Sequence, residues 1–180
     1  TPEQLEQLEQ VRPGRYTCTP DRDGWDYLYD IQKLAELGGK KLHSKRNHIH
    51  RFEERYPDWK VEEITIDNLA ECAEMDLEWN RLYRQERENG EETAQSRMDE
   101  RHAMSKAFAY YEPLGLSGLL LRVEGRVVAF TMGSPISVDT FDVHFEKAYG
   151  EIQGAYTMIN REFARWVRDR YPEVRYLNRE

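Results

Sequence analysis

The stretch 118–170 limits the possible folds more than any other part of the chain. It holds three runs with the composition of β-strands, followed by a segment whose apolar residues recur with helical spacing. A Glu124-Gly125 pair separates the first two runs, and such a pair is typical of a two-residue hairpin turn between antiparallel strands. We predict strands at 118–123, 126–135 and 140–148 and a helix at 155–170.

A small-residue bend, Gln153-Gly154-Ala155, leads into the predicted helix. The first turn of a helix has unpaired backbone N–H groups and the positive end of the helix dipole, so such a bend suits a phosphate group. Tyr156 and Asn160 follow one helical turn apart, where they would touch a ligand. These five residues are candidates for binding a phosphate-bearing donor. A flexible turn without a ligand is an equal alternative, because one glycine at a helix start is a weak motif.

The third of these predicted strands, 140–148, carries a second candidate site. Alternate residues of a strand face the same side, so either His144 and Glu146 or Phe145 and Lys147 would face a cleft. Acylation of an amine needs a base, which a carboxylate or an imidazole supplies. Glu146 is therefore the preferred catalytic candidate and His144 the second. The alternative is a pair of charged residues that only face water.

A run of basic residues without an acid, 40–51, stands out in a chain of net charge -8. Lys41, Lys45 and Arg46 are candidates for binding phosphate groups of a lipid headgroup, a nucleotide or a tRNA. A solvated helix face is the competing explanation. The three histidines of the run lack the i, i+4 spacing that helical metal ligands prefer, so no metal site is expected.

The remaining segments complete a mixed order of helices and strands. From Trp59 onward the predicted order is β-α-α-β-β-β-α-β. The other predicted features are a helical turn at 1–10, an irregular hairpin within 14–31, a short helix capped by Asp30 and ended by Gly38-Gly39, a helix stopped by Pro57, a strand at 60–66, a helix capped by Asp67 with a stripe of Leu69, Ala73, Leu77 and Leu82, a helix at 96–111 and a strand at 174–177.

Composition narrows the class of protein. The 180 residues suffice for one domain with an appendage, and no apolar run approaches the length of a membrane span. An acidic chain is a poor general binder of nucleic acid. Cys18 and Cys72 lack the spacing of metal or redox sites, so we expect two reduced thiols and a cytoplasmic protein. Nothing in the sequence indicates an oligomeric state.

The predicted order of elements resembles that of the GNAT acyltransferase fold, which continues with one further strand. More specifically, several segments resemble the bacterial DUF2156 proteins, whose domain is also called the phosphatidylglycerol lysyltransferase C-terminal domain. The resemblance spans 27–180, and its motifs are LGGKKLHSKRNHIHRFEERYPDW, GRVVAFTMGSPI, TFDVHFEKAYGEIQGAYTMINREFA and YLNRE. It implies an α/β protein with a mixed sheet flanked by helices. In this interpretation, residues 1–57 are the tail of a first GNAT-like half with the basic connecting helix, and residues 58–180 are a second GNAT-like half that lacks its final strand.

The resemblance implies transfer of an acyl or aminoacyl group, from acyl-CoA or aminoacyl-tRNA, to an amine or hydroxyl acceptor. The acceptor would be a small molecule or a lipid headgroup, tRNA would be a possible partner, and no cofactor would be bound covalently. The bend departs from the coenzyme A loop of GNAT enzymes, because Gln153 directly precedes a single Gly154. It fits better the Asn-Gly pair of the lysyltransferase domains, which favours an aminoacyl donor. The alternative is a binding module without catalysis. A cleft filled by side chains would favour the binding module, and an open cleft lined by Gln153, Glu146 and Tyr156 would favour the transferase.

Overall fold

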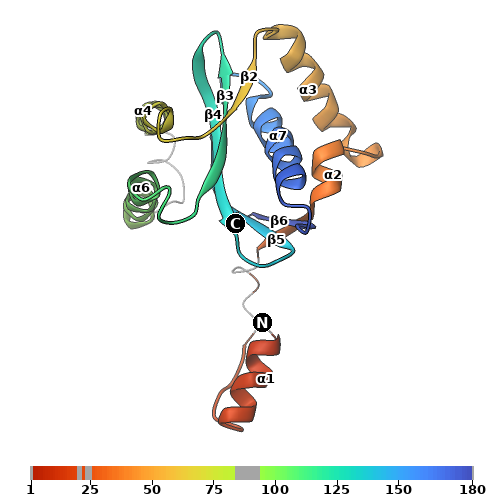
Figure 1. Cartoon of the computed structure of the whole chain (residues 1–180), viewed down its shortest axis with the longest axis vertical. Coiled ribbons are helices and arrows are strands. Elements are labelled where there is room, and N and C mark those ends of the chain that lie inside the picture. Colours follow the sequence, from red (N-terminus) through yellow and green to blue (C-terminus); the bar gives the residue numbers. More distant parts are fainter. Residues whose placement is uncertain (1, 20–21, 23–25, 84–93, 180) are drawn as a thin grey trace.

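A computed structural model of the chain describes residues 2–19, 22, 26–83 and 94–179. Its centre is a mixed sheet with the strand order β1-β6-β5-β4-β3-β2 (Figure 1). The strands β5 and β6 pair in parallel, and every other neighbouring pair is antiparallel. The strands are β1 (Tyr27–Asp30), β2 (Lys60–Glu63), β3 (Ser117–Val123), β4 (Arg126–Pro135), β5 (Thr140–Ala148) and β6 (Tyr176–Arg179).

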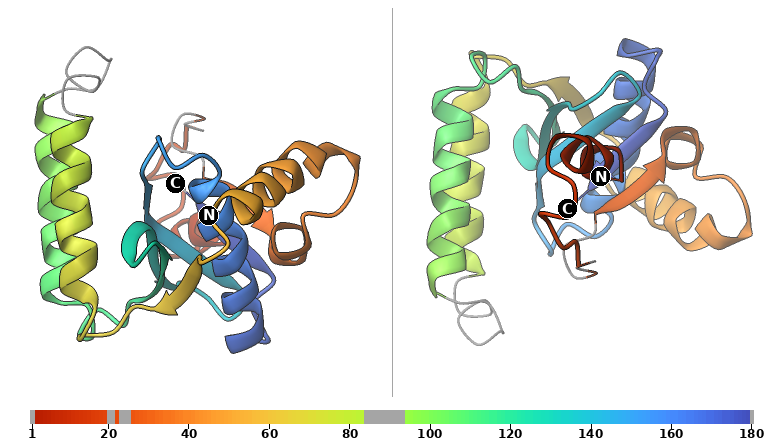
Figure 2. Two further views of the ribbon diagram at one scale, coloured as in Figure 1. Left: turned by 90° about the horizontal axis from the view of Figure 1, so that it is seen from above. Right: turned by 90° about the horizontal axis from the view of Figure 1, so that it is seen from below.

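Helices cover both faces of the sheet (Figures 1 and 2). One face carries α2 (Ile31–Glu36), α3 (His43–Arg55) and α7 (Ala155–Arg170), and the other carries α4 (Leu69–Leu82) and α6 (Ala94–Ala109). A 3-10 turn, η1 (Lys40–Leu42), precedes α3, and α1 (Pro2–Val11) lies apart from the sheet (Figure 1). No helix in the described part of the chain is both long and apolar enough to cross a membrane.

The core has two layers, one on each face of the sheet. Phe141 of β5 packs edge-on against Phe163 of α7, with ring centroids 5.6 Å apart. Across the sheet, Phe130 of β4 packs against Phe108 of α6 at 5.8 Å. Burial on both faces explains why residues 127–133 of β4 are buried without the alternation of a half-exposed strand. The predicted α/β class, a mixed sheet flanked by helices, is confirmed.

The predicted order of elements from Trp59 onward is confirmed. The three strands β3, β4 and β5 and the helix α7 occupy the predicted segments within a residue. Glu124 and Gly125 both have positive φ, 51° and 77°, as a two-residue turn of type I′ requires. Local turn chemistry and strong apolar periodicity therefore determine this half of the fold.

The hairpin predicted within 14–31 is wrong for the described residues. Tyr29 of β1 lies opposite Leu177 of β6, so the strand pairs with the far end of the chain. The loop of this hairpin was predicted at 20–24, and its residues 20–21 and 23–24 lie outside the described part. The cap of the following helix is confirmed, since Asp30 Oδ1 accepts a hydrogen bond of 3.0 Å from the Lys33 N–H. The domain division after residue 57 stays a prediction, although β1 shares the sheet of the later strands.

The predicted start of α4 needs a correction. Asn68, not Asp67, occupies the N-cap position, and it makes no side-chain cap. Its Oδ1 instead accepts a hydrogen bond of 2.8 Å from the N–H of Thr65. The side chain therefore stabilises the turn before the helix.

The predicted buried face of α4 is also wrong. Leu77 is 64% exposed, whereas Cys72, Met75 and Asp76 are buried. Asp76 takes a buried position because the Lys147 ammonium of β5 lies 2.6 Å from its Oδ1. The prediction followed the spacing of apolar residues and therefore assigned Asp76, a charged residue, to the exposed face. The predicted buried face consequently lies on a different side of the helix from the observed one.

An irregularity in β4 and β5 determines which side chains reach each face. Gly133 lies opposite Val143 and Met132 lies opposite Phe145, so His144 is an extra residue, a β-bulge. A Cβ atom at Gly133 would lie 1.9 Å from the carbonyl oxygen of Asp142, so the two strands approach each other there only because the residue is glycine.

Candidate functional site

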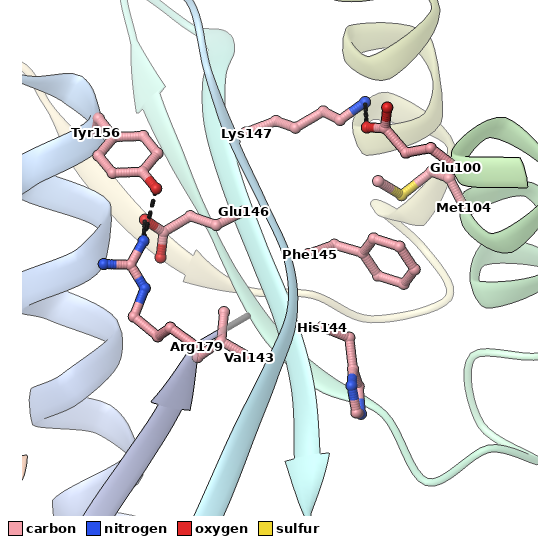
Figure 3. Close-up of a pocket in the computed structure, with 9 residues that line it drawn as sticks. All are labelled: Glu100, Met104, Val143, His144, Phe145, Glu146, Lys147, Tyr156 and Arg179. Carbon is pink, nitrogen blue, oxygen red and sulfur yellow. Dashed lines mark hydrogen bonds and ion pairs between the residues drawn. The ribbon is translucent and has the colours of Figure 1, made fainter. Parts of the chain in front are cut away.

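A cavity of about 350 Å³ lies beside β5, between α6, the first turns of α7 and the end of β6 (Figure 3). The described pairing of the parallel strands β5 and β6 ends at Val143 and Arg179, and the cavity begins at this point. The lining residues are Glu100, Met104, Val143, His144, Phe145, Glu146, Lys147, Tyr156 and Arg179.

Glu146 is the more deeply buried of the two acids in the described lining of the cavity. Its side chain is 4% exposed and points from β5 toward α7 (Figure 3). One carboxylate oxygen, Oε1, lies 3.0 Å from Nη2 of Arg179, and the other accepts a hydrogen bond of 3.3 Å from Asn160. Two strands and one helix thus fix the carboxylate in place.

The environment of Glu146 shifts its proton affinity. Burial raises the pKa of Glu146, because desolvation disfavours the charged form. The positive charge of Arg179 and the hydrogen bond from Asn160 oppose this shift without cancelling it. A buried carboxylate with a raised pKa in a cavity has the property that a general base needs.

Tyr156 of α7 supplies a hydroxyl beside the carboxylate. Its phenolic oxygen accepts a hydrogen bond of 2.6 Å from Arg179, so its own proton can be donated elsewhere (Figure 3). Burial raises the pKa of Tyr156, which keeps the phenol protonated. The cavity therefore holds a carboxylate and a phenol that share one guanidinium.

Lys147 faces the other side of the sheet, toward α4 and α6 (Figure 3). Its ammonium lies 2.6 Å from Asp76 and 3.0 Å from Glu100, and 4.5 Å from the ring centroid of Trp79. The side chain is 7% exposed. This buried cluster joins β5 to both helices of that face.

His144 does not share the face of Glu146, contrary to the predicted alternation. The bulge turns His144 to the side of Phe145 and Lys147 (Figure 3). There its imidazole contacts Ser134 Oγ at 2.8 Å and Asp142 Oδ2 at 3.0 Å. The structure thus brings Tyr156 and Asn160 to Glu146 but leaves His144 on the other face.

The bend before α7 has a packing role of its own. Gly154 has φ of 93°, and a Cβ atom there would lie 2.9 Å from the carbonyl oxygen of His48 and 3.0 Å from Cβ of Phe52. Only glycine permits this contact between the start of α7 and α3. Gln153 is exposed and Ala155 is buried, and the cavity lining described above includes neither.

The basic candidates lie on η1 and α3. Lys41 and Lys45 are exposed, and the described lining of the cavity includes none of the three. The guanidinium of Arg46 donates to the carbonyl oxygens of Leu37 and Gly39, the latter at 2.8 Å. These carbonyls follow the last turn of α2, so Arg46 serves as a cap there. Among the described residues, no group of three or more His, Cys, Asp or Glu side chains is arranged to hold a metal ion.

Sequence reasoning missed Arg179 as a site residue. Arg179 follows three β6 residues that give no indication of a ligand, and its contact with Glu146 joins positions that are far apart in the chain. The one sequence signal for Arg179 was its place in the YLNRE motif, which carries part of the family resemblance but does not indicate a role for the residue.

A model of the family described as phosphatidylglycerol lysyltransferase, C-terminal, matches residues 1–178. None of the curated proteins compared with the chain matches it. A crystal structure of a conserved protein of unknown function from Bacteroides thetaiotaomicron is 42% identical, with a TM-score of 0.85 over 99% of this chain and 57% of that one. The chain therefore spans little more than half of this relative.

Two distant structures share the fold. One is the C-terminal DUF2156 domain of a putative lysylphosphatidylglycerol synthetase from Agrobacterium fabrum, at 14% identity and a TM-score of 0.56 over 85% of this chain and 45% of that one. The other is a functionally unknown conserved protein from Staphylococcus epidermidis, at 12% identity and a TM-score of 0.53 over 98% of this chain and 66% of that one.

Proposed function

The chain belongs to the phosphatidylglycerol lysyltransferase C-terminal family, and from this premise we propose that the cavity at Glu146 transfers an aminoacyl group to an amine or hydroxyl acceptor. The observation that carries the proposal is the buried Glu146 carboxylate, held by Arg179 and Asn160 at the edge of an open cavity. A structural ion pair alone needs no cavity beside it.

In the proposed reaction, Glu146 takes a proton from the acceptor as its oxygen or nitrogen attacks the aminoacyl carbonyl. The ester bond to the ribose of the tRNA then breaks, and the leaving oxygen receives a proton from Tyr156. The raised pKa of Glu146 supports the first role, and the Arg179 guanidinium, which lies 2.6 Å from the Tyr156 hydroxyl and would stabilise the phenolate, supports the second. Positioning of donor and acceptor in one cavity would supply most of the remaining rate enhancement.

Aminoacyl-tRNA is the proposed donor and a lipid headgroup the proposed acceptor. The family name supports transfer of an aminoacyl group to a lipid headgroup, and acyl-CoA remains the alternative donor. Phosphate groups of the donor would be bound at the turn 153–156 and by Lys41 and Lys45. Support for this part comes from the exposed Gln153 and lysines, and from the packing of α7 against α3 at Gly154.

A binding module without catalysis is the second candidate. The packing of Gly154 against His48 favours it, since the glycine is then explained without a phosphate. The cavity beside Glu146 and Tyr156 argues against it, because a cleft that had lost its chemistry would be expected to fill with side chains.

Thermal-shift titration of the complete protein separates these candidates. A ligand that binds only the folded state raises the melting temperature. Stabilisation by a charged tRNA pool, and not by the same pool after deacylation, is the expected result. Stabilisation by coenzyme A or acetyl-CoA alone would identify an acyl-CoA enzyme, and no shift with any of them would favour the binding module.

A further inference from the structure

Three side chains form a hydrogen-bonded line on the face of the sheet opposite Glu146. Ser134 Oγ lies 2.8 Å from Nε2 of His144, and Nδ1 of the same imidazole lies 3.0 Å from Oδ2 of Asp142. Ser134 and Asp142 are cross-strand partners of β4 and β5, and the bulge adds His144 to their face. Neighbouring strands therefore hold all three groups.

The chemistry of the three groups fixes the direction of the hydrogen bonds. An ionised carboxylate only accepts, so Nδ1 of His144 must carry the proton that contacts Asp142. In the neutral imidazole the lone pair then lies on Nε2, where it can accept the hydroxyl proton of Ser134. This is the arrangement in which a histidine activates a serine nucleophile.

The carboxylate of this line is buried, the imidazole is partly exposed, and the serine borders a groove. The side chain of Asp142 is 8% exposed and that of His144 is 29% exposed. Ser134 and His144 line a groove of about 540 Å³ between the sheet and α6. A substrate in this groove would reach the hydroxyl directly.

The groove has the surface of an acyl-binding site. Its walls include Leu114, Leu116 and Phe145, and Lys106 brings an ammonium group to the described lining. The apolar walls suit a short acyl chain, and the ammonium of Lys106 suits the negative charge that develops on a carbonyl oxygen under attack.

The Asp142 carboxylate has one oxygen whose burial lowers the stability of the fold. Its Oδ1 is buried and has no hydrogen-bond partner among the described residues. A buried carboxylate oxygen without a partner is destabilising, and such groups recur where a function retains them.

We propose that Ser134 is a nucleophile that accepts the acyl group of an ester bound in this groove, with His144 as the base and Asp142 as a positioning residue. The bond from Ser134 Oγ to the acyl carbon forms while the ester C–O bond breaks. The serine proton passes to Nε2 of His144 and then to the leaving alcohol. Water, deprotonated by His144, cleaves the acyl-serine to a carboxylic acid and restores Ser134. The net reaction is hydrolysis of the ester, and it is independent of the function proposed for Glu146.

Labelling with a biotinylated fluorophosphonate tests the nucleophile. Attack by Ser134 would form an O–P bond and release fluoride, and mass spectrometry of peptides from the labelled protein locates the adduct. The expected result is an adduct on Ser134 that is absent in Ser134→Ala and forms at least about 100-fold more slowly in His144→Gln. Ser137→Ala is the matched control, since Ser137 donates to Asp139 and has no histidine among its described hydrogen-bond partners. Labelling of Ser134 in this variant should proceed at the wild-type rate.

A second measurement addresses the positioning role and the stability of the variants. Asp142→Asn should slow labelling and Asp142→Glu should restore part of the rate, with melting temperatures recorded for each variant. Hydrolysis of p-nitrophenyl butyrate should follow the same order. The absence of an adduct on wild-type Ser134, or equal labelling rates in wild type and a folded His144→Gln variant, would overturn the proposal. The wild-type peptide decides the question even if Ser134→Ala fails to fold.

Discussion

Arg179 Nη2 lies 3.0 Å from Glu146 Oε1 and 2.6 Å from the hydroxyl of Tyr156, at the point where the described pairing of the parallel strands β5 and β6 ends. One guanidinium thus orients both groups that would move protons in the proposed reaction. The geometry of the cavity depends on the end of β6, a short strand that carries little sequence signal of its own.

The raised pKa of Glu146 predicts a particular dependence of stability on pH. Because the folded state binds this proton more tightly than the unfolded chain, the Glu146 charge destabilises the fold as pH rises through the folded-state pKa. Glu146→Gln mimics the protonated form at every pH. The free energy of unfolding of the variant, minus that of the wild type, should therefore increase between pH 5 and pH 8. Urea denaturation at several pH values measures it, and a difference independent of pH would contradict the assignment.

Gly154 should be more sensitive to substitution than a glycine of similar φ in open space. Gly154→Ala adds a Cβ atom 2.9 Å from the His48 carbonyl, whereas Gly125→Ala meets nothing within 4 Å. Both substitutions incur the left-handed strain of about 1–2 kcal/mol, and Gly154→Ala adds about 1–3 kcal/mol from overpacking. Chemical denaturation of the two variants compares them. Equal losses would show that α7 and α3 are not in close contact there.

Lys147 should stabilise the fold because its ammonium neutralises the carboxylates of Asp76 and Glu100. Lys147→Ala leaves the Asp76 carboxylate, 10% exposed, without its ammonium, and we expect a loss of about 3–5 kcal/mol. Arg81→Ala removes an exposed partner of Glu78 at 3.9 Å and should change stability by less than about 0.5 kcal/mol. Urea denaturation of both variants tests the contrast, and a small effect of Lys147→Ala would show that the cluster opens readily to water.

The two cysteines should differ sharply in reactivity. Cys18 is exposed, whereas Cys72 is fully buried and burial raises the pKa of its thiol to about 12. Iodoacetamide at pH 8 should therefore modify Cys18 in the native protein and Cys72 only after unfolding, because the thiolate is the reactive form. Mass spectrometry of the labelled protein distinguishes the two, with Cys18→Ser as the control. Rapid native labelling of Cys72 would contradict its place in the core.

The parts of the fold that local sequence determines were predictable. The Glu124-Gly125 turn and the apolar runs around it define β3 and β4, and the periodicity of 155–170 defines α7. The partner of β1 was not predictable, because pairing with β6 depends on residues far away in the chain. The buried face of α4 was missed because Asp76, a charged residue, occupies it.

The candidate site was predictable only in part. Glu146, Tyr156 and Asn160 meet as the position of α7 after β5 suggested, and Arg179 joins them through a tertiary contact without a local signal. The face of His144 depends on a bulge opposite Gly133, and a strict alternation along the strand cannot reveal it. Single irregularities of the backbone, rather than the pattern of the strand, decide which side chains share a site.

The most direct test of the proposed function is the rate at which the complete protein transfers radiolabelled amino acids from a charged tRNA pool to vesicles that contain phosphatidylglycerol. Glu146→Gln should lower this rate by at least about 100-fold while the protein stays folded, and the exposed Glu112→Gln control should leave it unchanged. Transfer by Glu146→Gln at the wild-type rate would show that the carboxylate is not the base.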